Sequence, residues 1–112
     1  MAKINVYDLS IFGVRLQKMK SAMLLLNIYI QKCDEYNRIE LKKKELADVL
    51  GKSKRTIANW IIILAKNGAI KYKYSGSTRL NPFFAYSGTS EDYKQAQIEW
   101  RNFKSDIEEV CA

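Results

Sequence analysis

The chain of 112 residues contains no histidine, one proline and only two cysteines, Cys33 and Cys111. Zinc sites need several histidine or cysteine ligands and no CxxC pair is present, so the sequence predicts no metal site and no other cofactor. Two free thiols in a reducing cytosol are the simpler interpretation of the cysteines, and a disulfide between them is the alternative. The sequence also lacks a GxxxxGK[ST] phosphate-binding loop and a recognisable group of catalytic carboxylates, so we expect no enzymatic activity.

Long apolar runs are missing as well. The run at residues 22–30 is interrupted by Asn27 and is too short to span a bilayer as a helix. The N-terminus has no charged segment followed by an apolar run, so we expect no signal peptide, no membrane partner and a cytoplasmic location. With 47% apolar residues, the chain is most simply one domain, residues 1–112.

The charge of the chain is unevenly distributed. Residues 38–79 include eleven basic and three acidic residues, a net charge of +8, whereas the rest has eight basic and nine acidic residues, a net charge of −1. The whole excess of +7 therefore lies on one segment, and a generic solvated surface would spread it more evenly. This distribution predicts a polyanion as partner.

Residues 43–67 of that segment have the pattern of a helix-turn-helix. Gly51 ends the first helix, because the residue after a helix often adopts a positive φ, and Ser53 is a good N-cap for the second. In this motif the second helix enters the DNA major groove, where cationic, amide and hydroxyl side chains meet phosphates and base edges. An ordinary helical hairpin with solvated lysines is the alternative. The residues expected to contact DNA here are Lys43, Lys52, Ser53, Lys54, Arg55, Thr56 and Asn59.

An extended segment follows Gly68, and residues 69–86 have the alternating pattern of a β-hairpin around the turn Ser75-Gly76-Ser77. A hairpin directly after a recognition helix is the wing of a winged helix-turn-helix, and residues 39–41 fit an additional short strand. An edge hairpin whose lysines discourage pairing is the alternative. Wing residues expected to contact phosphates or the minor groove are Lys71, Lys73, Ser75, Ser77 and Arg79.

Two further helices flank this unit, at residues 17–36 and 90–110, and residues 4–6 fit a short strand or an extended arm. The first helix is apolar around much of its circumference, and the last repeats apolar residues every seven positions. This seam packs either within the chain or between two chains, and we expect a homodimer. Its expected interface residues are Leu25, Ile28, Tyr29, Tyr93, Trp100, Phe103, Ile107 and Val110.

Residues 80–84, with the sequence LNPFF, are followed by Gly88, and the chain begins with KINVYDL after its first two residues. In these features, over residues 3–103, the chain resembles the RepL-type plasmid replication proteins of Gram-positive bacteria. The resemblance implies DNA binding in replication or copy control of a plasmid or mobile element.

The predicted fold is mainly α with a small β-hairpin (α+β), a winged helix-turn-helix with an added N-terminal helix and a C-terminal helix. The predicted function is sequence-specific binding of double-stranded DNA, with replication or transcription machinery as further partners. A small dimeric transcriptional repressor of the same fold is one alternative. A winged helix that binds protein and no DNA is another.

Overall fold

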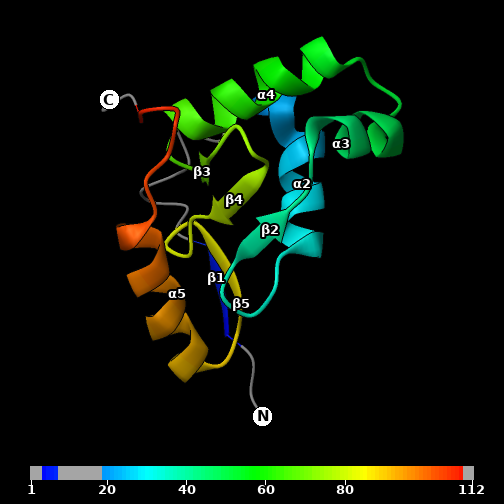
Figure 1. Cartoon of the computed structure of the whole chain (residues 1–112). Helices are drawn as coiled ribbons and strands as arrows, with labels where there is room; N and C mark the ends of the chain where they lie inside the picture. The colour runs from blue at the N-terminus through cyan, green and yellow to red at the C-terminus, as the bar shows by residue number, and fades with distance from the viewer. Residues whose placement is uncertain (1–3, 8–18, 110–112) are drawn as a thin grey trace.

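The computed structural model describes residues 4–7 and 19–109, and it has the predicted α+β, winged-helix-like fold (Figure 1). The elements follow one another as β1 (Ile4–Tyr7), the 3₁₀ turn η1 (Lys20–Ala22), α2 (Met23–Lys32), β2 (Arg38–Glu40), α3 (Lys43–Leu50), α4 (Lys54–Lys66), β3 (Ile70–Tyr72), β4 (Ser77–Leu80), β5 (Ala85–Gly88) and α5 (Ser90–Asn102).

Helices α3 and α4 form the predicted helix-turn-helix. Gly51 follows α3 with a φ of +64°, a left-handed conformation that glycine adopts without steric cost. The Ser53 hydroxyl oxygen then accepts a hydrogen bond of 3.2 Å from the Thr56 N–H, which caps the start of α4. The predicted end of α3 at Gly51 and the predicted start of α4 after Ser53 are therefore confirmed.

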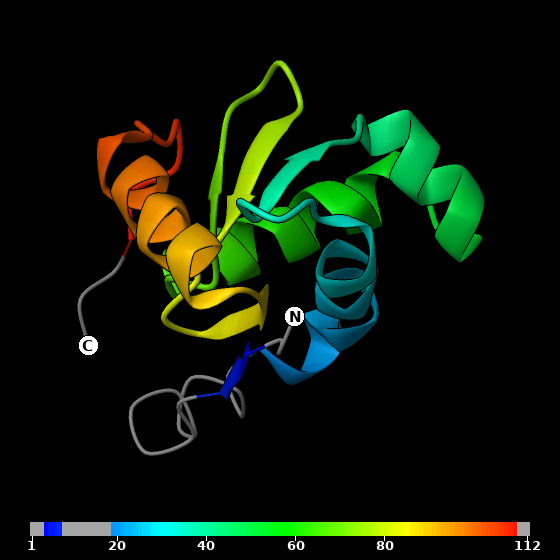
Figure 2. The ribbon, with the colours of Figure 1, turned by 90° about the horizontal axis from the view of Figure 1, so that it is seen from below.

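The wing hairpin consists of β3 and β4, which pair with Ile70 opposite Leu80. Strand β2 pairs with the other edge of β4, so the antiparallel sheet has the order β2-β4-β3. The turn between β3 and β4 projects from the body of the protein, with α3 on one side and α5 on the other (Figure 2). The strand predicted at residues 39–41 is thus confirmed as part of the wing sheet, although it begins and ends one residue earlier than predicted.

Strand β5 leaves this hairpin and pairs with β1, with Val6 opposite Tyr86. The predicted hairpin 69–86 was therefore too long, since its last residues belong to a second sheet. The cause is the turn that begins at Asn81, whose carbonyl accepts from the N–H groups of Phe84 and Ala85, both at 3.0 Å. Pro82 within this turn has no N–H to donate to a strand ladder. The strand expected near residues 4–6 is present as β1.

The hydrophobic core lies between α2, α4 and one face of the wing sheet, as Figure 1 shows. On α4, the predicted apolar residues Ile57, Ile61 and Leu64 are fully buried. On α2, Leu25 and Tyr29 are fully buried as well. The core thus fixes α4 by one side, and its opposite side faces solvent.

The two flanking helices are shorter than the expected ranges 17–36 and 90–110. In the first, α2 ends at Lys32 because the Asp34 carboxylate accepts from the N–H groups of Tyr36 and Arg38, which forms a turn. In the last, α5 ends at Asn102, and residues 103–109 continue along the edge of β3. The seven-residue repeat therefore does not continue as a helix through Ile107.

Candidate nucleic-acid interface

The solvent-facing side of α4 carries a stripe of four residues, Arg55, Asn59, Ile62 and Lys66. Their spacings of four, three and four place them on one side of the helix. All four are exposed, and 39% of the Ile62 surface is accessible although the residue is apolar. Within the described residues no hydrogen bond or ion pair is formed by the side chains of Arg55 and Asn59. We call these four residues the α4 stripe.

The turn before α4 provides further polar groups. Lys52 and Lys54 are exposed. The Ser53 hydroxyl donates a hydrogen bond of 3.0 Å to the Thr56 hydroxyl oxygen, in addition to capping the helix. Ser53 and Thr56, both predicted to contact DNA, therefore already have a structural role, whereas Lys52 and Lys54 are exposed.

An open cleft of about 430 Å³ lies between the wing turn and the first residues of α3 and α4. Lys43 reaches over two rings in it, with its Nζ 5.8 Å from the ring centroid of Tyr72 and 5.7 Å from that of Tyr74. The sequence analysis predicted Lys43, Lys54 and Ser75 as contact residues here. We call this site the lysine cleft, and its lining residues are Lys42, Lys43, Lys44, Lys54, Tyr72, Tyr74, Ser75 and Gly76.

The sequence analysis missed Lys42, Lys44 and Tyr74. The run of three lysines at residues 42–44 was visible, but a helix start displays consecutive side chains in different directions, so the run alone did not place them around one cleft. Tyr74 was assigned to the alternating strand pattern. In the structure it lies beyond the end of β3, in the wing turn, with 69% of its surface exposed.

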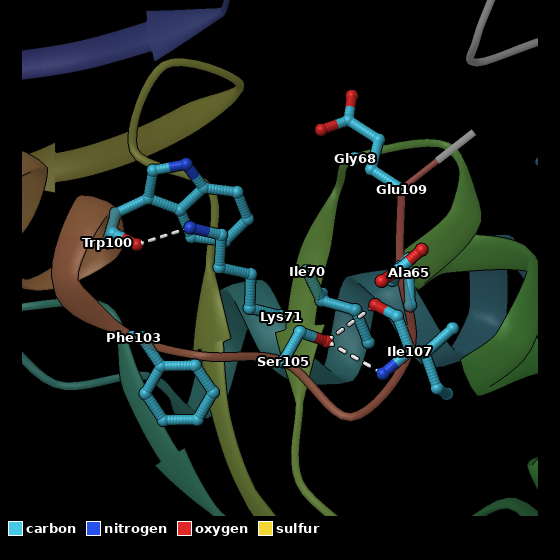
Figure 3. A pocket seen from close by; sticks show the side chains of 10 residues that line it. Ala65, Gly68, Ile70, Lys71, Trp100, Phe103, Ser105, Ile107 and Glu109 are labelled. Atoms are coloured by element: carbon cyan, nitrogen blue, oxygen red, sulfur yellow. Dashed lines mark hydrogen bonds between the residues drawn. The ribbon is translucent and has the colours of Figure 1, made fainter. Parts of the chain in front are cut away.

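The opposite face of the wing sheet carries Lys71 and Arg79, which lie side by side on β3 and β4. The Lys71 ammonium donates a hydrogen bond of 2.6 Å to the Trp100 carbonyl oxygen, in the last turn of α5, and lies 4.6 Å from the indole ring (Figure 3). Burial lowers the pKa of Lys71. This cation therefore holds the C-terminal end of α5, where a helix favours positive charge.

Phe103 contacts two more cations of this face. Its ring centroid is 4.7 Å from the guanidinium carbon of Arg79 and 4.8 Å from the Lys73 ammonium. Arg79 is also close to two carboxylates, with its Nε 3.9 Å from Glu99 and its Nη1 3.9 Å from Glu40. The structure thus places Lys71, Lys73 and Arg79, all predicted to contact DNA, against the chain's own C-terminal region.

The two serines of the wing differ in the same way. Ser77 donates a hydrogen bond of 3.0 Å to the Glu40 carboxylate, which joins β4 to β2. Ser75, in contrast, is exposed and lines the lysine cleft. Of the five wing residues predicted to contact DNA, only Ser75 is free of such a structural contact among the described residues.

Residues 103–109, which we call the C-terminal strap, cover the free edge of β3 (Figures 1 and 3). The Asp106 N–H donates to the Tyr72 carbonyl at 2.7 Å, and the Ser105 hydroxyl oxygen accepts from the Tyr72 N–H at 3.0 Å. The Asp106 carboxylate accepts from the Tyr74 N–H at 2.9 Å. These bonds satisfy backbone groups that an uncovered edge strand leaves open to pairing.

The described residues of the expected dimer interface pack within the chain. Leu25 and Tyr29 are fully buried in the core, and only 8% of the Trp100 surface is exposed. Tyr93 packs on Tyr86 with ring centroids 5.0 Å apart. The half-buried members are Ile28, Phe103 and Ile107, and Val110 lies outside the described residues. The intramolecular alternative for the seam therefore accounts for these contacts, and the homodimer stays a prediction.

The LNPFF motif and the glycine after it have structural roles. The Asn81 side chain donates 2.8 Å to the Gly68 carbonyl at the end of α4 and accepts 2.8 Å from the Phe83 N–H. The Tyr86 hydroxyl donates 2.8 Å to the Glu35 carbonyl and lies where a side chain at position 88 would project, so Gly88 fits there without a collision. The motif therefore fixes the path from the wing to β5.

The helix-turn-helix, the strand before it and the wing hairpin after it define a protein with a winged-helix-like fold. The chain matches the family described as Firmicute plasmid replication protein (RepL) over residues 7–111, and it belongs to that family. No match was found among curated proteins or solved structures. Within residues 4–7 and 19–109, no helix has the length and apolar character needed to cross a membrane. The same residues contain no group of three or more Cys, Asp or Glu side chains that could hold a metal ion.

Proposed function

We propose that this protein binds double-stranded DNA in a sequence-specific manner and acts in replication or copy control of a plasmid or mobile element. The α4 stripe carries the proposal. It presents hydrogen-bonding side chains along a helix whose opposite side is buried in the core. The side chains of Arg55 and Asn59 form no hydrogen bond or ion pair among the described residues. The family match supports the replication context.

In this proposal α4 lies in the major groove and its residues have distinct roles. The Arg55 guanidinium suits the O6 and N7 atoms of guanine, and the Asn59 amide suits the N6 and N7 atoms of adenine. An exposed Ile62 side chain suits contact with a thymine methyl group. Lys52, before the helix, and Lys66, at its end, suit phosphates on either side of the groove.

The test compares affinities for the replicon's own DNA and for scrambled duplex. Arg55→Ala is expected to lower affinity for the specific fragment by about 5- to 150-fold, the usual cost of about 1–3 kcal/mol for a lost two-bond contact, and to affect scrambled DNA less. Arg55→Lys retains the charge without the forked pair of donors, so it is expected to lose most of the specificity. The matched control is Arg101→Ala, which removes an exposed arginine from α5.

Equal losses on specific and scrambled DNA would contradict base contacts by Arg55. Unchanged affinities for every variant of the α4 stripe would contradict DNA binding through α4. Wild-type protein that binds no duplex at all would leave the protein-interaction alternative standing.

A further inference from the structure

The lysine cleft combines a concentrated positive charge with an exposed aromatic ring. Four of its lining residues are lysines and none is acidic. Among the described residues no carboxylate forms an ion pair with Lys42, Lys43, Lys44 or Lys54. Two carboxylates bind backbone N–H groups of the cleft residues, Glu45 that of Lys42 and Asp106 that of Tyr74.

The cleft is shaped by the fold before any ligand arrives. Gly76 has a φ of +103°, and a side chain there would lie 3.4 Å from the Leu41 carbonyl oxygen and 3.5 Å from the Lys42 side chain. The wing turn can therefore pack directly against the start of α3. The turn is closed by a 2.8 Å hydrogen bond from the Gly76 N–H to the Lys73 carbonyl. Rigid walls lower the ordering cost of binding.

Tyr74 is not needed to fill the core. Its ring is 69% exposed, and it touches the edge of the fully buried Tyr72 ring at a centroid distance of 6.0 Å. Lys43 also lies over this ring, with its Nζ 5.7 Å from the centroid. Duplex phosphates would engage the lysines and leave the exposed part of the ring without a stacking partner. An unpaired base has a free face to stack on tyrosine, whereas a base inside a duplex is already stacked on its neighbours.

We propose that the lysine cleft binds a single strand of DNA, with phosphates on the lysines and one unpaired base stacked on Tyr74. The site is distinct from the α4 stripe, which we assign to duplex DNA, although Lys54 at the start of α4 lines the cleft. A protein with both sites holds a duplex and an adjoining opened strand together. The recognition is independent of base sequence, because every base offers an aromatic face.

The experiment measures fluorescence anisotropy of labelled oligothymidine and of a duplex of equal length at one salt concentration. Tyr74→Ala is expected to weaken oligothymidine binding about 5- to 100-fold, the usual effect of losing one stacked base, and to change duplex binding less than about 2-fold. Tyr74→Phe keeps the ring and is expected to bind like wild type. Lys44→Ala is expected to weaken single-strand binding, whereas Lys94→Ala, an exposed lysine on α5, serves as its control.

Folding is checked for each variant by urea unfolding, and Tyr74→Ala is expected to unfold like wild type because Asp106 binds the backbone of residue 74. Oligothymidine substituted with iododeoxyuridine gives an independent readout, with photochemical cross-linking expected at Tyr74. Absence of single-strand binding, or equal losses on both DNAs for Tyr74→Ala, would overturn the proposal. Arg55→Ala separates the two sites, since it is expected to impair duplex binding alone.

Discussion

The basic residues around the lysine cleft and those on the side of the wing sheet that faces α5 differ in what they contact. The four lysines of the cleft lie at the starts of α3 and α4, and they form no ion pair among the described residues. On the face toward α5, Lys71 binds a helix carbonyl and an indole ring, and Lys73 and Arg79 bind Phe103. The first group carries four positive charges and the second three, but only the first borders an open cleft that a ligand can enter.

This difference shows why net charge locates a ligand surface only approximately. A lysine that covers an aromatic ring and satisfies a helix carbonyl contributes to packing, since its desolvation is offset by contacts within the chain. An exposed lysine without a carboxylate partner retains its long-range attraction for phosphate. The number of lysines in the wing is therefore less informative than the contacts that the fold gives to each of them.

The largest effect is expected from a substitution on the side of the wing sheet that faces α5. Trp100→Ala removes an indole ring that is 8% exposed and that Lys71 covers, and it is expected to lower the free energy of unfolding by about 3–5 kcal/mol. Ile98→Ala, at a residue of the same helix that is 49% exposed, is expected to change it by less than about 0.5 kcal/mol. Urea denaturation measures both.

The same measurement bears on the homodimer. If Trp100 packs within one chain, the unfolding midpoint is independent of protein concentration. A midpoint that rises with concentration would place the seam between chains, and sedimentation equilibrium would then give about twice the 13.0 kDa mass of one chain. Equal effects of the two variants would contradict a buried Trp100.

A smaller effect is expected when the strap is loosened. Ser105→Ala deletes the hydroxyl oxygen that accepts the Tyr72 N–H, so this backbone donor on β3 loses its partner. We expect a loss of about 1–3 kcal/mol in the free energy of unfolding, and duplex affinity unchanged. Ser90→Ala, at an exposed position at the start of α5, is the matched serine control. A large drop in duplex affinity for Ser105→Ala would mean that the strap side takes part in DNA binding.

The smallest expected effect is electrostatic and compares Lys52→Ala with Lys73→Ala. Lys52 is exposed beside the start of α4, so its removal is expected to weaken specific and scrambled duplex alike and to make the salt dependence shallower by about one unit. Lys73 lies over Phe103, and its removal is expected to leave that slope unchanged. Binding titrations over a range of salt concentrations measure the slopes. If Lys73→Ala made the salt dependence shallower and Lys52→Ala did not, the assignment of DNA contact to the α4 side and of packing to the α5 side would be contradicted.

Local signals in the sequence predicted much of the fold. The conformation of Gly51, the cap at Ser53 and the apolar spacing of α4 each depend on a few neighbouring residues, so the helix-turn-helix followed from them. Strand alternation likewise predicted the hairpin. It did not indicate which side of the hairpin α5 covers, because that depends on contacts between residues far apart in the chain.

The C-terminal region shows the limit of periodicity. Ile107 continues the seven-residue repeat of Trp100, and the pattern alone favours a helix through both. In the structure, the exposed edge of β3 offers hydrogen bonds to Ser105 and Asp106, and the chain leaves the helix after Asn102 to make them. The hydrogen bonds to the edge of β3 thus determine where α5 ends. No residue near Asn102 in the sequence indicates that position.

The most direct test of the account is a DNase I footprint of wild-type protein along the complete DNA of the plasmid or element that carries its gene. The account predicts a discrete protected segment inside the replication origin, lost with Arg55→Ala and retained with Lys73→Ala. Protection confined to a promoter would favour the repressor alternative. Uniform protection without a preferred segment, or a footprint that Arg55→Ala leaves unchanged, would contradict sequence reading by α4.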